Sequence, residues 1–136
     1  MNKLTVGRLA RDAGVNLETV RYYERQGLVS PAARTESGYR IYQQESVRRI
    51  RFIKRAQELG FSLHEIKELL SLKVDSDATA ADVRVRAQAK LVSVEEKIRH
   101  LQDIQQSLTR LIESCHGVGP AADCPILENL DGKDFE

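Results

Sequence analysis

The sequence has no apolar run near the roughly 18 residues needed to cross a bilayer, so we expect no membrane span. Its first residues lack the apolar segment of a signal peptide, and we therefore expect a cytosolic protein. Cysteine is scarce, because Cys115 and Cys124 are the only two. Cytosolic thiols stay reduced, which makes a disulfide between them the less favoured state. Their spacing is not Cys-x-x-Cys, and no phosphate loop or acid–base constellation is present, so we do not expect an enzyme.

Charge of both signs is abundant but unevenly divided. Residues 1–55 hold 12 Lys/Arg and 5 Asp/Glu, a net charge of +7. Residues 56–136 hold 9 Lys/Arg and 15 Asp/Glu, a net charge of −6. A basic half beside an acidic half indicates that only the first half meets a polyanion.

The basic half has the pattern of a small DNA-binding module. Apolar residues recur at helical spacing over residues 4–12, and Asn16 is a candidate N-cap for a second helix over 17–26. Gly27 is suited to ending that helix. Two short helices joined by a Gly-bearing turn make a helix-turn-helix. A short basic hairpin within 33–42 is then predicted as a wing.

Two more helices are expected before the middle of the chain. The apolar spacing predicts a helix over 44–58, which Gly60 separates from the next one. Ser62 and Glu65 have the Ser-x-x-Glu spacing of a capping box, so the next helix is predicted to begin there and to run to about Leu72.

The acidic half is dominated by one long helix, since Pro and Gly are absent between about Ala81 and Glu113. A helix of about 33 residues would reach roughly 50 Å, too far to bury its apolar face on a domain this small. We therefore expect a second copy to cover that face in a homodimeric coiled coil, with antiparallel or parallel helices, and the fold that we predict has them antiparallel. The heptad seam consists of Ala87, Leu91, Val94, Ile98, Leu101, Gln105, Leu108 and Ile112.

The predicted fold class is mainly α, with five parts. A winged helix-turn-helix DNA-binding domain covers residues 1–72, and a linker covers 73–80. The dimerisation helix spans 81–113. A metal-binding loop and short helix follow over 114–130, and 131–136 form a disordered tail.

Side chains suited to DNA gather in three places along the basic half. Arginine makes bidentate contacts to guanine or phosphate, and tyrosine hydroxyls reach phosphate oxygens. Two of the tyrosines, Tyr23 and Tyr39, have a second interpretation as core aromatics. The candidate DNA-binding residues are Arg21, Tyr22 and Tyr23 on the second helix, Arg34, Tyr39, Arg40 and Tyr42 in the wing, and Lys54 and Arg55 on the helix after it.

The two cysteines lie in a loop that Gly117, Gly119 and Pro120 allow to reverse direction. A tight turn brings two sulfurs to one point, and thiolates prefer soft ions such as Cu(I), Ag(I), Au(I) and Hg(II). His116 is a possible third donor, or alternatively an exposed loop histidine. Two incidental thiols remain the alternative to a metal site.

Several of these motifs, in this order, resemble the MerR family of transcriptional activators. The first is Val-Arg-Tyr-Tyr-Glu-Arg-Gln-Gly-Leu over 20–28, followed by Ser-Gly-Tyr-Arg-Ile-Tyr over 37–42. The segment 56–66 matches the family's second-wing helix pair. The stretch from Cys124 to Leu130, after the cysteine loop, resembles the heavy-metal-sensing branch. The likeness covers about residues 3–130.

The resemblance implies a mechanism. Such dimers bind a palindromic element in a promoter whose spacer is too long for RNA polymerase, and they repress by holding the DNA bent. When metal binds they untwist the DNA, which activates metal efflux and detoxification genes. The expected partners are promoter DNA, RNA polymerase at that promoter and a second copy. By this likeness Arg21 and Tyr22 face the major groove. Arg34, Tyr39 and Arg40 clamp the backbone through the first wing, and Lys54 or Arg55 supports the second.

The resemblance also bears on the ion. In relatives that sense divalent Zn, Cd, Pb or Hg, a third Cys begins the dimerisation helix, whereas the copper, silver and gold branch has Ser. Here Ala80 aligns with that position and Thr79 stands beside it, so no thiolate is offered. Two thiolates suit a monovalent coinage metal, Cu(I) first, while a divalent ion usually seeks three or four donors. The loop length is closer to the zinc and mercury types. A divalent sensor using His116 or Asp123, and a thiol redox sensor, therefore stay as alternatives.

Overall fold

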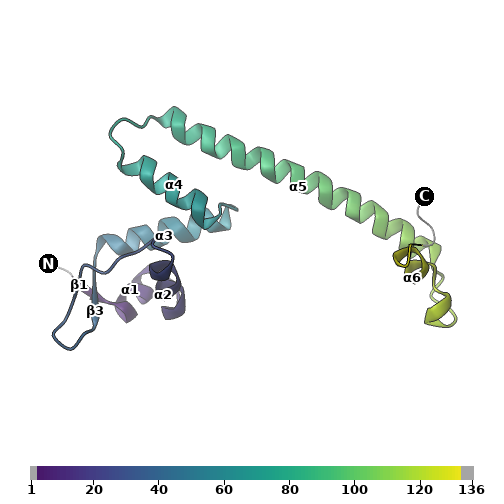
Figure 1. Cartoon of the computed structure of the whole chain (residues 1–136), viewed down its shortest axis with the longest axis horizontal. Helices are drawn as coiled ribbons and strands as arrows, with labels where there is room; N and C mark the ends of the chain where they lie inside the picture. Colours follow the sequence, from purple (N-terminus) through teal and green to yellow (C-terminus); the bar gives the residue numbers. More distant parts are fainter. Residues whose placement is uncertain (1–2, 133–136) are drawn as a thin grey trace. The chain divides into compact units, whose positions relative to one another are not determined.

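The computed structural model describes residues 3–132 of the chain, and Figure 1 follows its elements in sequence order. The predicted mainly helical, winged helix-turn-helix architecture is confirmed. The chain divides into two units within its longest helix, between Lys90 and Leu91. Of the expected tail, residues 133–136 lie outside the described part. The elements are β1 (Lys3–Thr5), α1 (Val6–Ala13), α2 (Leu17–Arg25), β2 (Ala33–Arg34), β3 (Arg40–Gln43), α3 (Glu45–Glu58), α4 (Leu63–Val74), α5 (Ala80–Ser114), the 3-10 turn η1 (Ala121–Asp123) and α6 (Pro125–Leu130).

The helix-turn-helix is formed by α1 and α2, and each helix is capped by its own sequence. The Thr5 hydroxyl accepts the Arg8 N–H at 3.2 Å, and the Asn16 side chain accepts the Thr19 N–H at 2.8 Å. Both satisfy backbone donors that a helix start leaves without partners. The N-cap predicted at Asn16 is confirmed. Gly14 ends α1 at φ 73°, a left-handed conformation that favours glycine.

The first helix begins later than its apolar spacing predicted, because residues 3–5 form a strand. Leu4 is paired with Tyr42 across the antiparallel β1–β3 ladder, and Arg34 with Arg40 across β2–β3. The sheet order is therefore β1-β3-β2. Pairing with a strand far along the chain has overridden a local helical pattern at Leu4. The extra strand ties the wing to the start of α1.

The core of the first unit joins the wing to the helix-turn-helix. Buried apolar side chains of α1, α2, α3 and α4 form one cluster with Tyr42 of β3. The largest fully buried side chains are Leu9, Val20, Leu28, Val29, Tyr42, Ile50, Ile53 and Ile66.

The predicted capping box at the start of α4 is confirmed. The Glu65 N–H donates to the Ser62 hydroxyl at 3.1 Å, and the Ser62 N–H donates to the Glu65 carboxylate at 2.7 Å. Helix α4 runs to Val74, two residues beyond its predicted end. The linker to α5 is correspondingly shorter than expected.

Helix α5 carries its apolar seam on the outside of the single chain. No residue of α5 is fully buried, and among the seam residues Leu91, Ile98, Leu101, Leu108 and Ile112 are exposed. An apolar stripe at heptad spacing is the surface that a coiled-coil partner covers. Within residues 3–132, no helix is long and apolar enough to span a membrane.

Candidate functional site

Helix α2 presents Arg21 and Tyr22 to solvent. The Arg21 Nη1 lies 3.4 Å from the Glu18 carboxylate, one turn earlier, and the Arg25 guanidinium lies 6.0 Å from the Tyr22 ring centre. About half of the Arg21 side chain remains exposed. Exposed ion pairs of this kind contribute roughly 0–1 kcal/mol, so they leave Arg21 free to exchange partners.

The structure corrects the expectation that Tyr23 contacts DNA. Its side chain lies in the core, and its hydroxyl donates to the Gln57 side chain of α3 at 2.5 Å. Burial, with the neighbouring Tyr22 hydroxyl, raises the pKa of Tyr23. The alternative interpretation of Tyr23 as a core aromatic is the right one.

Tyr42 is also a core residue and not a DNA contact. Strand β3 turns it inward opposite Leu4, and its hydroxyl donates to the Glu24 carboxylate of α2. Burial and then this hydrogen bond raise the pKa of Tyr42 to about 12. Sequence reasoning missed Glu24, whose carboxylate connects α2 to the wing strand.

Arg40 completes this connection. Its Nε lies 3.0 Å from the second carboxylate oxygen of Glu24, close enough for an ion pair. The angle is poor for a hydrogen bond, so the buried Nε has an ionic neighbour and no hydrogen-bond partner. About 39% of the Arg40 side chain is exposed. Arg40 therefore connects the wing strand to α2, while part of its side chain is exposed at the surface.

The tip of the wing is a tight turn that displays Tyr39. The Thr35 N–H donates to the Tyr39 carbonyl at 2.8 Å, and the Tyr39 N–H donates to the Thr35 hydroxyl at 3.1 Å. Gly38, at φ 87°, supplies the left-handed conformation that this turn requires. Tyr39 is 73% exposed, which excludes its interpretation as a core aromatic, and Arg34 beside it is exposed as well.

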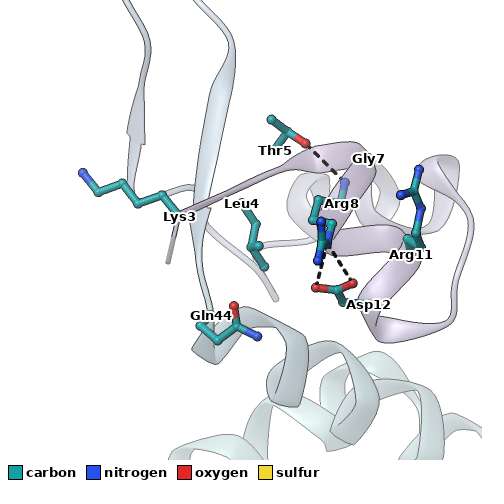
Figure 2. A pocket seen from close by; sticks show the side chains of 8 residues that line it. All are labelled: Lys3, Leu4, Thr5, Gly7, Arg8, Arg11, Asp12 and Gln44. Atoms are coloured by element: carbon teal, nitrogen blue, oxygen red, sulfur yellow. Dashed lines mark hydrogen bonds and ion pairs between the residues drawn. The ribbon is translucent and has the colours of Figure 1, made fainter. Parts of the chain in front are cut away.

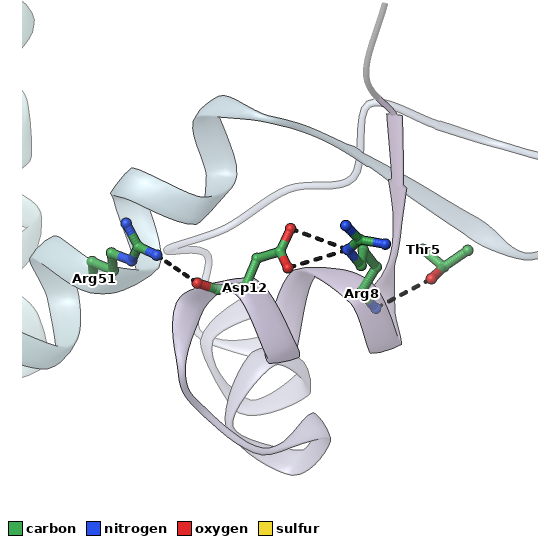
Figure 3. Close-up of polar contacts among 4 residues, drawn as sticks. All are labelled: Thr5, Arg8, Asp12 and Arg51. Carbon is green, nitrogen blue, oxygen red and sulfur yellow. Dashed lines mark hydrogen bonds and ion pairs between the residues drawn. The ribbon is translucent and has the colours of Figure 1, made fainter.

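Two cations of α3 hold the end of α1. Arg51 donates to the Asp12 carbonyl at 2.6 Å, as Figure 3 shows, and Lys54 donates to the Gly14 carbonyl at 3.1 Å. Carbonyls at a helix C-terminus lack intrahelical donors and carry partial negative charge. Lys54, a candidate DNA contact, thus binds the turn of the helix-turn-helix. Arg55 is exposed and lies 3.4 Å from Glu58.

A shallow groove of about 850 Å³ opens beside the first turn of α1 (Figure 2). Arg8 is held there by the Asp12 carboxylate, at 3.1 and 3.3 Å from its two oxygens. With Lys3 and Arg11, the groove has three cations against one carboxylate. This basic edge was missed by the sequence reasoning, which singled out only α2, the wing and α3.

In the second unit, the predicted loop brings Cys115 and Cys124 together. Their sulfurs lie 3.3 Å apart, and both side chains are half-buried. Gly117 and Gly119 have φ of 71° and 95°, so the chain reversal depends on conformations that other residues rarely adopt. Cys124 is also the N-cap residue of α6.

The thiol pair favours a thiolate at Cys124. The hydrogen bond between the two thiols, and then the Ile126 and Leu127 N–H groups at the start of α6, lower the pKa of Cys124. Thiolates are the form that binds soft metals, so the donor chemistry of this loop fits such an ion. Across residues 3–132, no three His, Cys, Asp or Glu side chains are grouped to hold a metal. In the single chain, neither His116 nor Asp123 is therefore grouped with the two sulfurs.

The chain matches the family description "MerR HTH family regulatory protein" over residues 4–73, and the related description "MerR, DNA binding" over 47–111. A mercuric resistance operon regulatory protein of Bacillus cereus is 44% identical, covering 94% of this chain and 97% of its own. A heavy metal-dependent transcription regulator of Rhizobium meliloti is 41% identical, covering 93% and 86%.

Among solved structures, the transcription regulator PbrR691 from Ralstonia metallidurans, in complex with lead(II), superposes with a TM-score of 0.84 at 30% identity. That superposition covers 93% of this chain and 98% of the other. These proteins are regulators and not enzymes. The chain therefore belongs to the MerR family of helix-turn-helix regulatory proteins, and the relatives it resembles include metal-dependent regulators.

Proposed function

We propose that the chain is a homodimeric sensor of a soft monovalent ion, Cu(I) first, then Ag(I) or Au(I). The observation that carries this proposal is the pair of sulfurs 3.3 Å apart in a loop where the described chain gathers no third donor. Two thiolates leave a monovalent ion with a net charge of −1 and leave a divalent ion without the donors it usually takes. Cys115 and Cys124 would hold the ion.

The ion would supply soft Lewis acidity that offsets part of the negative charge of the two thiolates, and residues of the chain would hold and orient these donors. The lowered pKa of Cys124 favours the thiolate form of one donor. Gly117 and Gly119 hold the reversal that keeps both sulfurs together.

The DNA-binding unit would use Arg21 and Tyr22 in the major groove of a palindromic promoter element. Arg34, Tyr39 and the exposed part of Arg40 would bind the backbone at the first wing. Lys54 and Arg55 would support the second wing, between α3 and α4. With the ion bound, the dimer would distort the promoter so that RNA polymerase transcribes efflux or detoxification genes.

The second candidate is a divalent sensor of the same family. The 44% identity to a mercuric resistance regulator and the fold shared with a lead(II) complex favour it. It needs at least one further donor, from His116 or Asp123. Because the sulfurs of Cys115 and Cys124 are already in contact, a thiol-based redox response is a third possibility.

The deciding experiment is titration of the reduced dimer with Cu(I) and with Zn(II) under oxygen exclusion, read by competition with a chelator of known affinity. We expect tight Cu(I) binding at one ion per cysteine pair and weak Zn(II) binding. Cys115→Ser and Cys124→Ser should abolish metal induction while operator binding stays nearly intact. His116→Ala is the matched control and should change neither. Tight Zn(II) binding lost in His116→Ala would replace the monovalent proposal with the divalent one.

The DNA-binding proposal has its own test, in operator affinity measured by anisotropy. Arg21→Ala removes a guanidinium that we place at a base edge, and we expect specific affinity to fall by roughly tenfold or more. Arg84→Ala, an exposed arginine on α5, is the control. Unchanged operator affinity in Arg21→Ala would remove this residue from the readout.

A further inference from the structure

Lys90 belongs to α5, yet its side chain reaches the turn between α3 and α4. The Nζ lies 2.8 Å from the Glu65 carboxylate and 5.7 Å from the centre of the Phe61 ring. Only 12% of the Lys90 side chain is exposed, although a surface lysine normally extends its ammonium into water. Ordering such a flexible side chain costs rotamer entropy, and the contacts with Glu65 and Phe61 have to offset that cost.

The carboxylate that Lys90 binds already has a structural task. The same Oε1 of Glu65 accepts the Ser62 N–H at 2.7 Å in the capping box of α4. The Lys90 ammonium and then the Ser62 N–H lower the pKa of Glu65 to about 2, so this carboxylate is ionised at every physiological pH. One oxygen atom thus joins the start of α4 to α5.

A second ion pair joins the same two helices, α5 and α4. The Arg86 Nη1 lies 2.6 Å from the Glu68 carboxylate. Residues 86 and 90 are four apart on α5, and residues 65 and 68 are three apart on α4, so each pair of residues shares a helix face. Helix α5 is therefore tied to α4 by two cation–carboxylate contacts, and the Lys90 contact is the one that also touches the turn.

The turn itself is exposed on one side and packed on the other. Leu59 is exposed, Gly60 has φ 93°, and Phe61 packs against the core of the first unit. A Cβ added at Gly60 would meet the Lys90 side chain at 4.0 Å, which is ordinary contact distance. The Lys90 side chain therefore lies next to Gly60 in the turn, as well as contacting Glu65 of the capping box.

We propose that Lys90 is a positioning residue for DNA binding, which holds the α3–α4 turn and the start of α4 in the orientation that the second wing presents to the operator. The role of this turn at DNA rests on the function proposed above, whereas the contacts of Lys90 do not. We do not expect Lys90 itself to contact DNA, because its side chain is mostly buried and its ammonium lies against Glu65 and Phe61.

The test uses the full-length dimer without metal. Lys90→Met keeps an unbranched apolar stem against Phe61 and removes the charge, whereas Lys90→Arg keeps the charge. We expect Lys90→Met to weaken operator affinity roughly three- to tenfold. The slope of the logarithm of operator affinity against the logarithm of salt concentration should become shallower by about one, because phosphate contacts at the second wing are lost. Lys90→Arg should stay within about twofold of wild type.

Two controls separate positioning from a general loss of charge or of stability. Lys97→Met removes an exposed lysine from the same helix and should bind the operator like wild type. Glu65→Gln keeps an acceptor for the Ser62 cap but removes the partner of Lys90. The double variant Lys90→Met/Glu65→Gln should bind no more weakly than the worse single variant, since both act through one contact.

The readout specific to positioning is amide exchange of Phe61 and Ser62, which should accelerate in Lys90→Met while the core strands keep their protection. Operator affinity within twofold of wild type, with an unchanged salt slope, would overturn the proposal. Equal loss in Lys97→Met would do the same. If Lys90→Met does not fold, the comparison of Lys90→Arg with Glu65→Gln decides. A wild-type dimer that ignores every metal would refute the proposed sensor and leave this metal-free comparison intact.

Discussion

Tyr42→Phe should destabilise the DNA-binding unit without touching any exposed surface. The substitution removes one hydroxyl from the core, and with it the hydrogen bond to the Glu24 carboxylate. A hydrogen bond to a charged acceptor contributes about 1.5–3 kcal/mol, and its loss leaves a mostly buried carboxylate with the Arg40 ion pair alone. For a unit of this size, each kcal/mol lowers Tm by roughly 4–8 °C. We expect a fall of about 10 °C.

The pH dependence gives a second, independent signature of the same contact. The pKa of Tyr42 is raised to about 12 in the folded chain, against about 10 in an unfolded one. Between these values the unfolded chain loses the proton first, so the stability that Tyr42 contributes is present below pH 10 and is lost as pH rises toward 12. The loss is at most about 3 kcal/mol, and Tyr42→Phe should lack it.

The assay is chemical denaturation at fixed dimer concentration, repeated from neutral pH to pH 11. Tyr39→Phe is the matched control, because that hydroxyl is exposed at the tip of the wing. Tyr39→Phe should keep its stability within about 0.5 kcal/mol and lose operator affinity. Tyr42→Phe should lose stability and keep its operator affinity under conditions where it is fully folded. Equal stability of the two variants would refute the reasoning that separates a core tyrosine from a surface one.

Three further results are expected. Glu65→Gln should make the free energy of unfolding depend less on pH in acid. The pKa of Glu65 is lowered to about 2, so the stability that its carboxylate contributes is present above pH 4.5 and is lost as the pH falls toward 2. Because its side chain is 39% exposed, we expect roughly 1 kcal/mol, measured by urea unfolding between pH 2 and 5. Leu101→Glu replaces a seam residue that is exposed in the single chain. Sedimentation should show a dimer dissociation constant at least about a hundredfold higher, while the stability of the DNA-binding unit stays unchanged. Arg51→Met loses the hydrogen bond to the Asp12 carbonyl, which should reduce the free energy of unfolding by about 1 kcal/mol and lower Tm by roughly 4–8 °C, whereas Arg48→Met changes an exposed side chain and should leave Tm unchanged.

Local signals in the sequence determined most element boundaries correctly. Asn16, and the Ser62–Glu65 pair, cap helices where their side-chain chemistry predicts, because a cap depends on neighbours within three residues. The loop between Cys115 and Cys124 was predicted for a similar reason, since its glycines permit the reversal. The bounds of α5 differ from the prediction by one residue at each end.

Pairing between distant segments explains what the sequence did not reveal. Leu4 has helical spacing with its neighbours, yet it lies in a strand because β3 is available to pair with it. The same register turns Tyr42 inward, and alternation along a strand of four residues does not say which face is buried. Tyr22 and Tyr23 are adjacent on α2, and helical spacing from Val20 left Tyr23 with two interpretations. Its burial and its hydrogen bond to Gln57 of α3 identify it as the core tyrosine. Lys90 does lie in the predicted dimerisation helix, but its ion pair with Glu65 was not predicted, because a heptad pattern does not show which residues the polar positions of a helix contact.

The strength of the α4–α5 contacts limits what they can do. Partly exposed ion pairs such as Lys90–Glu65 and Arg86–Glu68 are worth roughly 0–1 kcal/mol each. Moving a two-state promoter complex from almost fully off to almost fully on takes about 5.5 kcal/mol of differential binding. In the proposed mechanism these contacts therefore cannot drive the switch, and the required free energy would come from ion binding at the cysteine pair. The role that we propose for the contacts is to fix the geometry of the DNA-binding unit. For that reason, loss of Lys90 should weaken operator binding in both states by a similar factor, instead of locking the dimer in either one.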